Sequence, residues 1–209
     1  NIKMKIKFSI NKIVLFMIKA DFFFFSGLGL VSPVFAVFLT DNLKDGNIEV
    51  AGFAMAIYWI VRSIFEIPVA KFLDKCRGER DDLLCLVGGY LIVALVHFGY
   101  IQATLSWHIY ILQFVYAVAM AFAAPGWSAI FTRHIDKGKE GFEWGLEHVA
   151  YSVGIGIAGI ISGIVVANYG FNQLFMFAGI VAMVGALIPL FIYKDVNISG
   201  DHHIRFIKK

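Results

Sequence analysis

Residues 70–80 read Ala70-Lys71-Phe72-Leu73-Asp74-Lys75-Cys76-Arg77-Gly78-Glu79-Arg80, a stretch in which six of eleven side chains carry a charge. The segments on either side, 50–72 and 83–102, are long and mainly apolar. A transmembrane helix needs about 20 mainly apolar residues to cross a hydrocarbon core about 30 Å thick. The pattern therefore predicts two membrane-spanning helices joined by a short charged linker.

Apolar segments of this length recur along the whole chain. Hydrophobic residues make up 59% of the 209 and charged residues only 16%, a balance that would leave a soluble domain with too much exposed apolar surface. The segments are apolar all round instead of alternating, which excludes the strands of a membrane barrel. We therefore expect an all-α, polytopic membrane protein with six transmembrane helices. The expected spans are 13–39, 50–72, 83–102, 107–131, 144–168 and 171–193.

The distribution of basic residues predicts the orientation of the chain. Fifteen of the 18 Lys and Arg fall on one side of the predicted spans, whereas the other side has only Lys44. Because cytoplasmic loops retain positive charge, we expect a cytoplasmic basic arm (1–12), a six-helix membrane domain (13–194) and a cytoplasmic basic tail (195–209), in the plasma or inner membrane. The net charge of +3 reflects this topology, and no basic stripe indicates a nucleic-acid partner.

The six spans divide into two groups of three. The first and fourth spans are the ones interrupted by helix-weakening residues, Pro33 in one and Pro125 in the other. Interrupted helices at matching places in two three-helix repeats are typical of a transporter's substrate path, so both prolines are candidates for helix breaks that line a cavity. The alternative is that they only kink their helices.

Three charged residues, Asp21, Arg62 and Glu66, lie well inside the predicted spans. Arg62 and Glu66 are four residues apart, so they share a helical face and can pair. At about 1.5 Å per residue, Asp21 lies at a similar depth on the neighbouring antiparallel helix. Because a charge in the bilayer costs several kcal/mol by most estimates, these residues need partners or a watery cavity. We expect either a transport or proton site formed by Asp21, Arg62 and Glu66, or an ion-pair network that only fixes helix packing.

The charged linker resembles the cytoplasmic signature of the major facilitator superfamily, Gly-x-x-x-Asp-Arg/Lys-x-Gly-Arg/Lys-Arg/Lys. It matches at Asp74, Lys75 and Arg80, while Ala70 replaces the opening glycine and Gly78 comes one residue late. The resemblance implies one six-helix half of such a transporter. It also implies that Asp74 is the acid of a cytoplasmic latch, with Lys75 and Arg80 as its basic companions. Family members usually have twelve helices, twice the number predicted here.

Two residues near the start of the fifth span are candidate latch partners. Arg133 precedes this span, and Glu147 lies one turn deeper than the acidic residues of its first turn, where it could reach Arg133 or the linker. His97 and His148 receive no role, because a lone membrane histidine is usually a packing residue. We expect no cofactor and no metal site.

Small residues follow one face of the fifth span, at Gly156, Gly159 and Gly163. Such a face permits close approach of another backbone, from the same bundle or from a second chain. We therefore expect transport of a small solute by alternating access, with two copies, or this chain and a separate second half, enclosing the path. The alternative is a non-transporting accessory subunit or a transporter remnant.

The sequence does not favour an enzymatic function. Gly126-Trp127-Ser128 is loosely similar to the Gly-x-Ser of rhomboid proteases, whose nucleophile needs a base from the sixth helix. The sixth span contains no histidine, so we expect no catalytic residue.

Overall fold

The computed structural model describes residues 10–75 and 78–196, and within these ranges every regular element is helical. Most of the predicted basic arm and tail, and two residues of the charged linker, lie outside the described residues. The all-α fold class is confirmed. The elements are α1 (Lys12–Val31), η1 (Ser32–Val34), α2 (Phe35–Asp41), α3 (Ile48–Leu73), α4 (Glu79–Ile101), α5 (Ser106–His134), α6 (Glu140–Tyr169), α7 (Phe171–Leu187) and η2 (Ile188–Ile192).

Six helices in the described part of the chain are long and apolar enough to cross a membrane, as predicted. The first span combines α1, η1 and α2, and the last combines α7 and η2. Several helices extend beyond the predicted apolar segments, since α6 begins at Glu140, with Glu143 also in its first turn. Acidic residues stabilise a helix N-terminus through its dipole, so the helix continues past the hydrocarbon boundary.

Local signals define where the helices start and stop. The side chain of Asn11 accepts a hydrogen bond from the Ile13 N–H, and that of Asn47 accepts one from the Val50 N–H. Both caps satisfy amide groups that have no partner within the first helical turn. Between α6 and α7, Gly170 has a φ of 86°, a conformation that glycine adopts without steric cost.

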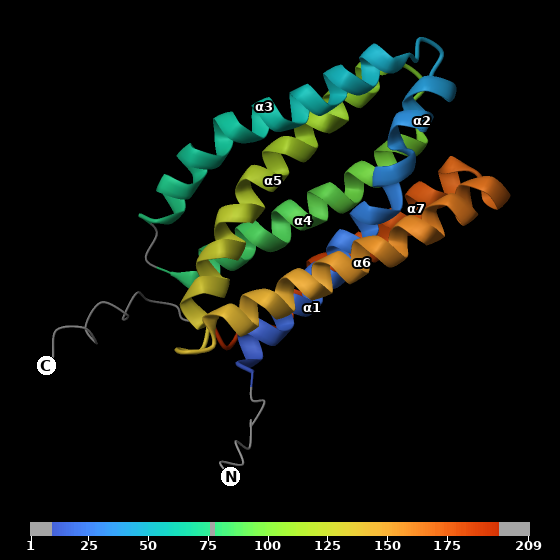
Figure 1. Cartoon of the computed structure of the whole chain (residues 1–209). Helices are drawn as coiled ribbons and strands as arrows, with labels where there is room; N and C mark the ends of the chain where they lie inside the picture. Colours follow the sequence, from blue (N-terminus) through green and yellow to red (C-terminus); the bar gives the residue numbers. More distant parts are fainter. Residues whose placement is uncertain (1–9, 76–77, 197–209) are drawn as a thin grey trace, which may run out of the picture.

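The helix pairings repeat between the two halves of the chain. Helix α1 packs on α6 and α7, while α5 packs on α3 and α4, and α4 packs on α7 between them. Exchanging the first three spans with the last three converts the α1–α6 pairing into α5–α3 and the α1–α7 pairing into α5–α4, and it leaves α4–α7 unchanged. Figure 1 shows α3 beside α5 and α6 beside α1. The two predicted three-helix repeats are therefore visible in the packing, and α3 and α6 are the least buried spans.

Close backbone contacts hold the central helices together at equivalent places. A Cβ atom on Gly27 of α1 would lie 2.7 Å from the Ala178 carbonyl oxygen of α7, and one on Gly89 of α4 would lie 2.8 Å from the Ala123 Cβ of α5. No larger side chain fits there without moving a helix. Small residues of this kind allow the dense packing that drives helix association in membranes.

The two prolines of the interrupted spans differ in their effect. Pro33 lies in η1, a 3-10 turn that separates α1 from α2, so the predicted break in the first span is confirmed. Pro125 lies inside α5, which continues without interruption to His134, and the predicted break there is wrong. Neighbouring helices can accommodate the missing amide of a proline in a membrane helix, which explains why α5 continues.

Both ends of the described chain lie on the same side of the bundle. The Nζ atom of Lys12 lies 2.8 Å from the Asp195 Oδ2 atom, which joins the start of α1 to the residues after η2. Figure 1 shows the same proximity. An even number of spans requires this arrangement.

Candidate functional site

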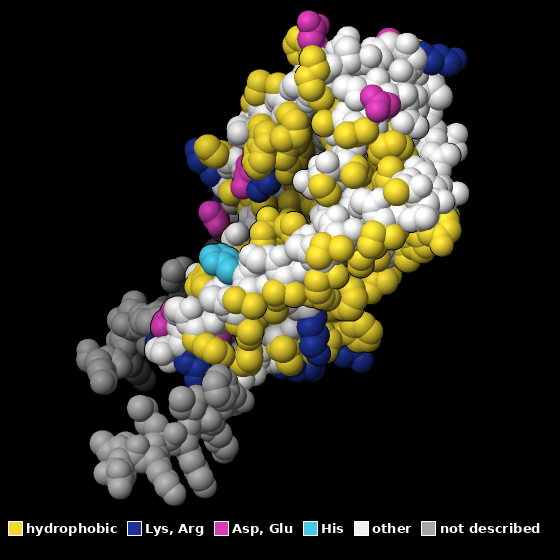
Figure 2. All heavy atoms as spheres, turned by 45° about the vertical axis from the view of Figure 1, so that its right-hand side comes forward, with side chains coloured by type: hydrophobic (Ala, Val, Ile, Leu, Met, Phe, Trp, Pro, Cys, Tyr) yellow, Lys and Arg dark blue, Asp and Glu magenta, His cyan; other side chains and the backbone are white. Residues whose placement is uncertain are grey.

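A cavity of roughly 680 Å³ lies near the middle of the bundle, between the α1–α6 pair and the α3–α5 pair. Helices α1, α3, α4, α5 and α6 all contribute to its lining, whereas α7 does not. The least buried spans, α3 and α6, flank it. Figure 2 shows one face of the molecule hollowed near its middle and surrounded by apolar side chains. The volume matches that of pockets for small organic molecules.

Aromatic side chains dominate the wall of this cavity. Phe25 packs edge-to-face against Tyr151 with ring centroids 4.7 Å apart, which joins α1 to α6. Tyr90 of α4 stacks on Phe24 of α1 at 3.5 Å. These contacts fix the rings that border the cavity. The lining aromatic residues are Phe25, Phe35, Tyr58, Trp59, Tyr90, Tyr100, Tyr116, Trp127, Trp144 and Tyr151.

Asp21 of α1 is the most buried carboxyl group in the cavity wall. It is 2% exposed and accepts a hydrogen bond of 2.9 Å from the Tyr90 hydroxyl. Glu147 of α6 is 6% exposed and lines the same cavity near Asp21. On its other side, the Oε2 atom of Glu147 lies 3.4 Å from the Nε2 atom of His148. The packing of α6 on α1 therefore creates a carboxyl pair that borders the cavity.

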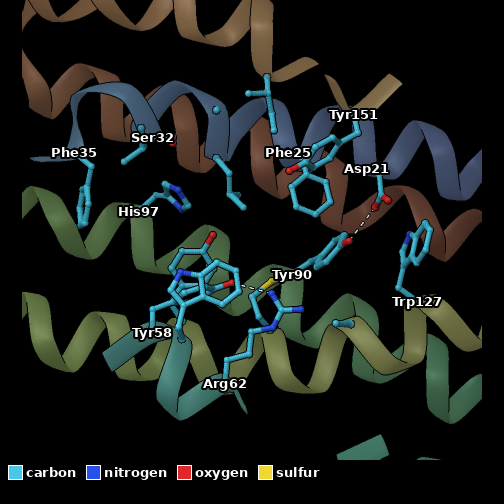
Figure 3. Close-up of a pocket in the computed structure, with 18 of the residues that line it drawn as sticks. Asp21, Phe25, Ser32, Phe35, Tyr58, Arg62, Tyr90, His97, Trp127 and Tyr151 are labelled. Carbon is cyan, nitrogen blue, oxygen red and sulfur yellow. Dashed lines mark hydrogen bonds between the residues drawn. The ribbon is translucent and has the colours of Figure 1, made fainter. Parts of the chain in front are cut away.

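Arg62 and Glu66 form the predicted pair on α3. The Arg62 Nε atom donates to the Glu66 Oε2 atom at 2.8 Å, and its Nη1 atom donates to the Tyr58 hydroxyl at 3.1 Å. Among the described residues, no hydrogen bond or ion pair joins Arg62 to Asp21. Figure 3 places these two side chains on opposite walls of the cavity. The predicted triad is thus divided, because α1 packs on α6 and α7, while α3 packs mainly on α5.

The position of Glu147 corrects its predicted role as a latch partner. Glu147 is seven residues from the start of α6, about 10 Å along the helix axis. At that depth its side chain lies near Asp21 of α1, and in the described ranges no hydrogen bond or ion pair joins it to Arg133. Glu147 therefore belongs to the central cavity.

A second, smaller pocket of roughly 420 Å³ lies where α3, α4 and α5 meet at the end of the bundle that carries the linker. Asp74, Asp82 and Arg133 all line it, and Arg133 forms an ion pair with Asp82. The structure thus brings Asp74 and Arg133 to one site, as predicted. Pro125 lines this pocket and not the central cavity, and Pro33 lines neither, so their assignment to the cavity wall was wrong.

The two basic companions of Asp74 differ in position. Lys75 is exposed, whereas Arg80, in the first turn of α4, lies over the ring of Tyr193 with its guanidinium carbon 4.6 Å from the ring centroid. Arg80 therefore contacts the end of the last span through a cation–π interaction.

Three residues of these sites were not identified from the sequence. Asp82 is 2% exposed, and its position at the edge of the third span, like that of Asp74 at the edge of the second, was an available signal. Tyr90 and Gln113 lie within apolar spans, where only their polarity distinguishes them. Gln113 is 4% exposed and lines the central cavity, and its side-chain oxygen has no hydrogen-bond partner among the described residues.

His97 and His148 occupy different environments. His97 is buried, and its Nδ1 atom lies 2.8 Å from the Val93 carbonyl oxygen of the same helix, which satisfies the ring locally. His148 is exposed beside Glu147 at the rim of the cavity. Neither residue belongs to a group of three or more metal-ligating side chains in the described ranges.

The glycine face of α6 does not pack within the bundle. A Cβ atom added at Gly156, Gly159 or Gly163 would meet no atom within 4 Å, whereas one at Gly154 would meet the Ser26 hydroxyl of α1 at 2.6 Å. The described chain therefore leaves this face open, and of the two predicted uses, packing within one bundle is excluded for these three residues.

Comparisons with known proteins agree with this architecture. The family model described as Major Facilitator Superfamily matches residues 20–203. The chain superimposes on the crystal structure of the POT family transporter PepTSo with a TM-score of 0.75 and 15% identity, covering 89% of this chain and 38% of that one. At that identity the likeness concerns the fold alone.

Curated relatives show the same partial coverage. The chain is 23% identical over 183 residues to an uncharacterised MFS-type transporter of Methanocaldococcus jannaschii, covering 88% of this chain and 46% of the relative. It is 23% identical over 188 residues to the class E tetracycline resistance protein of Escherichia coli, covering 90% and 45%. The chain thus spans less than half the length of both relatives.

Proposed function

Because this chain belongs to the Major Facilitator Superfamily, we propose that it forms one six-helix half of a transporter that carries a small solute across the membrane by alternating access. The protein is a multi-pass integral membrane protein, and we propose that both ends of the chain are cytoplasmic. The central cavity carries the proposal, because it places polar side chains at mid-bundle between the two least buried spans. Transporters of this class bind their substrate near the membrane midplane, between two halves.

A second six-helix half, either another copy or a separate chain, completes the path in this proposal. The cavity contains Asp21 and Arg62, and lipid would be a costly environment for either charge. The open glycines of α6 would allow a neighbouring backbone to approach closely. A second half packed against α3 and α6 would cover both features.

Cross-linking combined with native mass spectrometry tests this arrangement. The chain is reconstituted in lipid nanodiscs, with cysteine introduced at Gly156 on the open face of α6. If two copies pair through α6, native spectra contain a dimer and oxidation links the Gly156→Cys protein to itself. Ile180→Cys, on the exposed surface of α7, is the control that should not link. A monomer without cross-links would exclude the homodimer, and co-expression with a candidate second half would then be the next measurement.

The pocket lined by Asp74 and Arg133 supports the further proposal of a cytoplasmic latch. Asp74 ends α3, while Lys75 and Arg80 follow it across the linker. Charges at such a position can bind different groups in the inward and outward states. We expect Asp74→Asn to change the accessibility of cysteines introduced along α3, and Asp81→Asn, which lies exposed nearby, to serve as the control. Unchanged labelling would exclude the latch.

A further inference from the structure

The charges that face the central cavity are unevenly compensated. Arg62 on α3 is engaged by Glu66 at 2.8 Å and also donates to Tyr58. Asp21 and Glu147, on α1 and α6, have no Lys or Arg partner among the described residues. The remaining titratable groups that border the cavity are Tyr58, Tyr90, His97, Tyr100, Tyr116, His148 and Tyr151. The α1–α6 wall therefore carries two carboxyl groups and, among its described residues that line the cavity, no Lys or Arg.

Two carboxyl groups this close need a positive charge between or beside them. Each is at least nine-tenths buried, and water can only partly screen their repulsion. The Tyr90 hydroxyl donates one hydrogen bond to Asp21, which satisfies a single acceptor position of the four oxygens. A proton or a bound cation would complete the site.

A buried acceptor elsewhere in the same cavity points to a ligand with hydrogen-bond donors. The side-chain oxygen of Gln113 lines the cavity and has no partner among the described residues. An unpaired buried acceptor costs about 1–3 kcal/mol until a donor reaches it. Together with the carboxyl pair, it adds a third acceptor group to the cavity wall, beside the Nε1 donor of Trp127, which also has no partner among the described residues.

The aromatic rings around the carboxyl pair favour a cation with an apolar body. Tyr90 contacts Asp21 directly, Trp127 lies beside it, and Phe25 and Tyr151 border the same space (Figure 3). Aromatic faces attract a desolvated cation by about 2 kcal/mol or more, and they bury apolar groups as well. A neutral sugar would bring no positive charge to the carboxyl pair. An anion would be repelled by Asp21 and Glu147.

We infer that the central cavity binds an organic cation, a small molecule with a protonated nitrogen and an apolar body, and that Asp21 and Glu147 contact the nitrogen. Gln113 supplies a further acceptor for an N–H group along the cavity. This inference rests on the proposed transport function and names its substrate class. It also assigns Glu147 to the substrate site.

Binding of adamantane methylamine to the full chain in lipid nanodiscs tests the inference. Three of the four tryptophans, Trp59, Trp127 and Trp144, line the cavity, so intrinsic fluorescence reports its occupancy directly. Adamantane methanol has the same apolar body without the charge and serves as the matched ligand, and empty nanodiscs measure partition into lipid. We expect saturable binding of the amine, at least about tenfold tighter than that of the alcohol.

Isosteric variants assign the binding to the carboxyl pair. Asp21→Asn and Glu147→Gln should each weaken amine binding by about tenfold or more, while Glu66→Gln, on the opposite wall, should change it less than about twofold. Size-exclusion profiles and circular dichroism show whether each variant remains folded. Equal affinity for amine and alcohol, or unchanged binding in both folded variants, would overturn the inference.

The assay separates this inference from the proposed transport function. A site that holds only a proton would bind no amine, and that result would overturn the inference while leaving transport of another solute open to flux assays. Conversely, amine binding to a chain that never assembles with a second half would support the site and contradict the transporter.

Discussion

The charged side chains of the α1–α6 wall and of α3 differ in how they are paired and buried. On α3, Arg62 and Glu66 neutralise each other within one helix, and their side chains are 20% and 37% exposed. On the α1–α6 wall, Asp21 and Glu147 come from different helices, are almost completely buried, and have the same sign. The first arrangement is self-sufficient, whereas the second needs a partner from outside the bundle.

This difference indicates which wall carries the function. A paired Arg and Glu at a helical spacing of four can form wherever α3 is placed, so the pair can serve packing alone. A buried carboxyl pair assembled by two helices destabilises the bundle unless a proton or a cation compensates it. Polar residues inside membranes are costly and are usually functional, and the uncompensated pair is the clearer case.

The largest expected effect on amine binding comes from giving the α1–α6 wall an acid–base pair like that of α3. Glu147→Lys would place a cation beside Asp21 and form an ion pair there. We expect binding of adamantane methylamine to fall by about hundredfold or more, equivalent to about 3 kcal/mol, because the lysine both neutralises Asp21 and repels the ligand. Tryptophan fluorescence titration measures the loss.

A matched change on the rim controls for the new positive charge. His148→Lys introduces a cation next to Glu147 but at an exposed position, where water screens it. Its effect should be much smaller than that of Glu147→Lys. Equal losses in the two variants would show that general electrostatics, and not the carboxyl pair, controls binding.

Neutralising Asp21 should have an intermediate effect on transport, whereas neutralising Glu66 should have little effect. In proteoliposomes of the assembled transporter, we expect Asp21→Asn to reduce counterflow of the amine by about tenfold, which corresponds to about 1.4 kcal/mol. Glu66→Gln should retain at least about half of the flux, because Glu66 pairs with Arg62 and does not line the cavity. Normal flux in Asp21→Asn would remove its proposed role.

The ion pair between Arg133 and Asp82 should contribute more to stability than the pair between Arg62 and Glu66. Arg133→Met would leave the buried Asp82 carboxylate unpaired and should lower the free energy of unfolding by about 1 kcal/mol, a modest value because Arg133 is 39% exposed. Arg62→Met should cost less, since Glu66 remains partly exposed. Thermal unfolding in detergent compares the two variants. A larger loss for Arg62→Met would contradict the ranking.

The smallest effect is expected at Asp45, which lies outside the spans. Hydrogen bonds from the Ser106 hydroxyl, at 2.6 Å, and the Ser106 N–H, at 2.8 Å, lower the pKa of Asp45. Because its folded pKa lies below the unfolded value of about 3.9, this stabilisation is present at neutral pH and is lost as the pH falls through the lowered pKa. Asp45→Asn should therefore make thermal stability slightly less dependent on pH in that acidic range. An unchanged acid profile would show that the contact contributes nothing.

Helical periodicity and charge content predicted much of this protein without a structure. The six spans and the Arg62–Glu66 pair all depend on residues close together in the sequence, where a fixed rise per residue sets the geometry. The break at Pro33 was predicted for the same reason. Pro125 shows the limit of such reasoning, because whether a proline breaks a membrane helix depends on the helices that surround it.

Partner choice between distant helices was the part that needed the tertiary structure. The helical rise predicts a depth for Asp21 but leaves its neighbour open, and the predicted partner Arg62 contacts Tyr58 and Glu66 instead. The sequence predicts Glu147 as a latch partner because it lies one turn deeper than the acidic first turn of its span. The packing of α6 on α1 instead places it in the wall of the central cavity.

The sequence by itself thus determined that the chain is a helical membrane bundle with a charged linker and an internal Arg–Glu pair. These properties follow from hydrophobic length and local helical geometry, which do not depend on how the helices assemble. Only the tertiary structure decided that Asp21 meets Glu147, that Gln113 lines the same cavity, and that the glycines of α6 remain open. Rotation of each helix about its axis selects those contacts, and rotation is set by packing among all six spans.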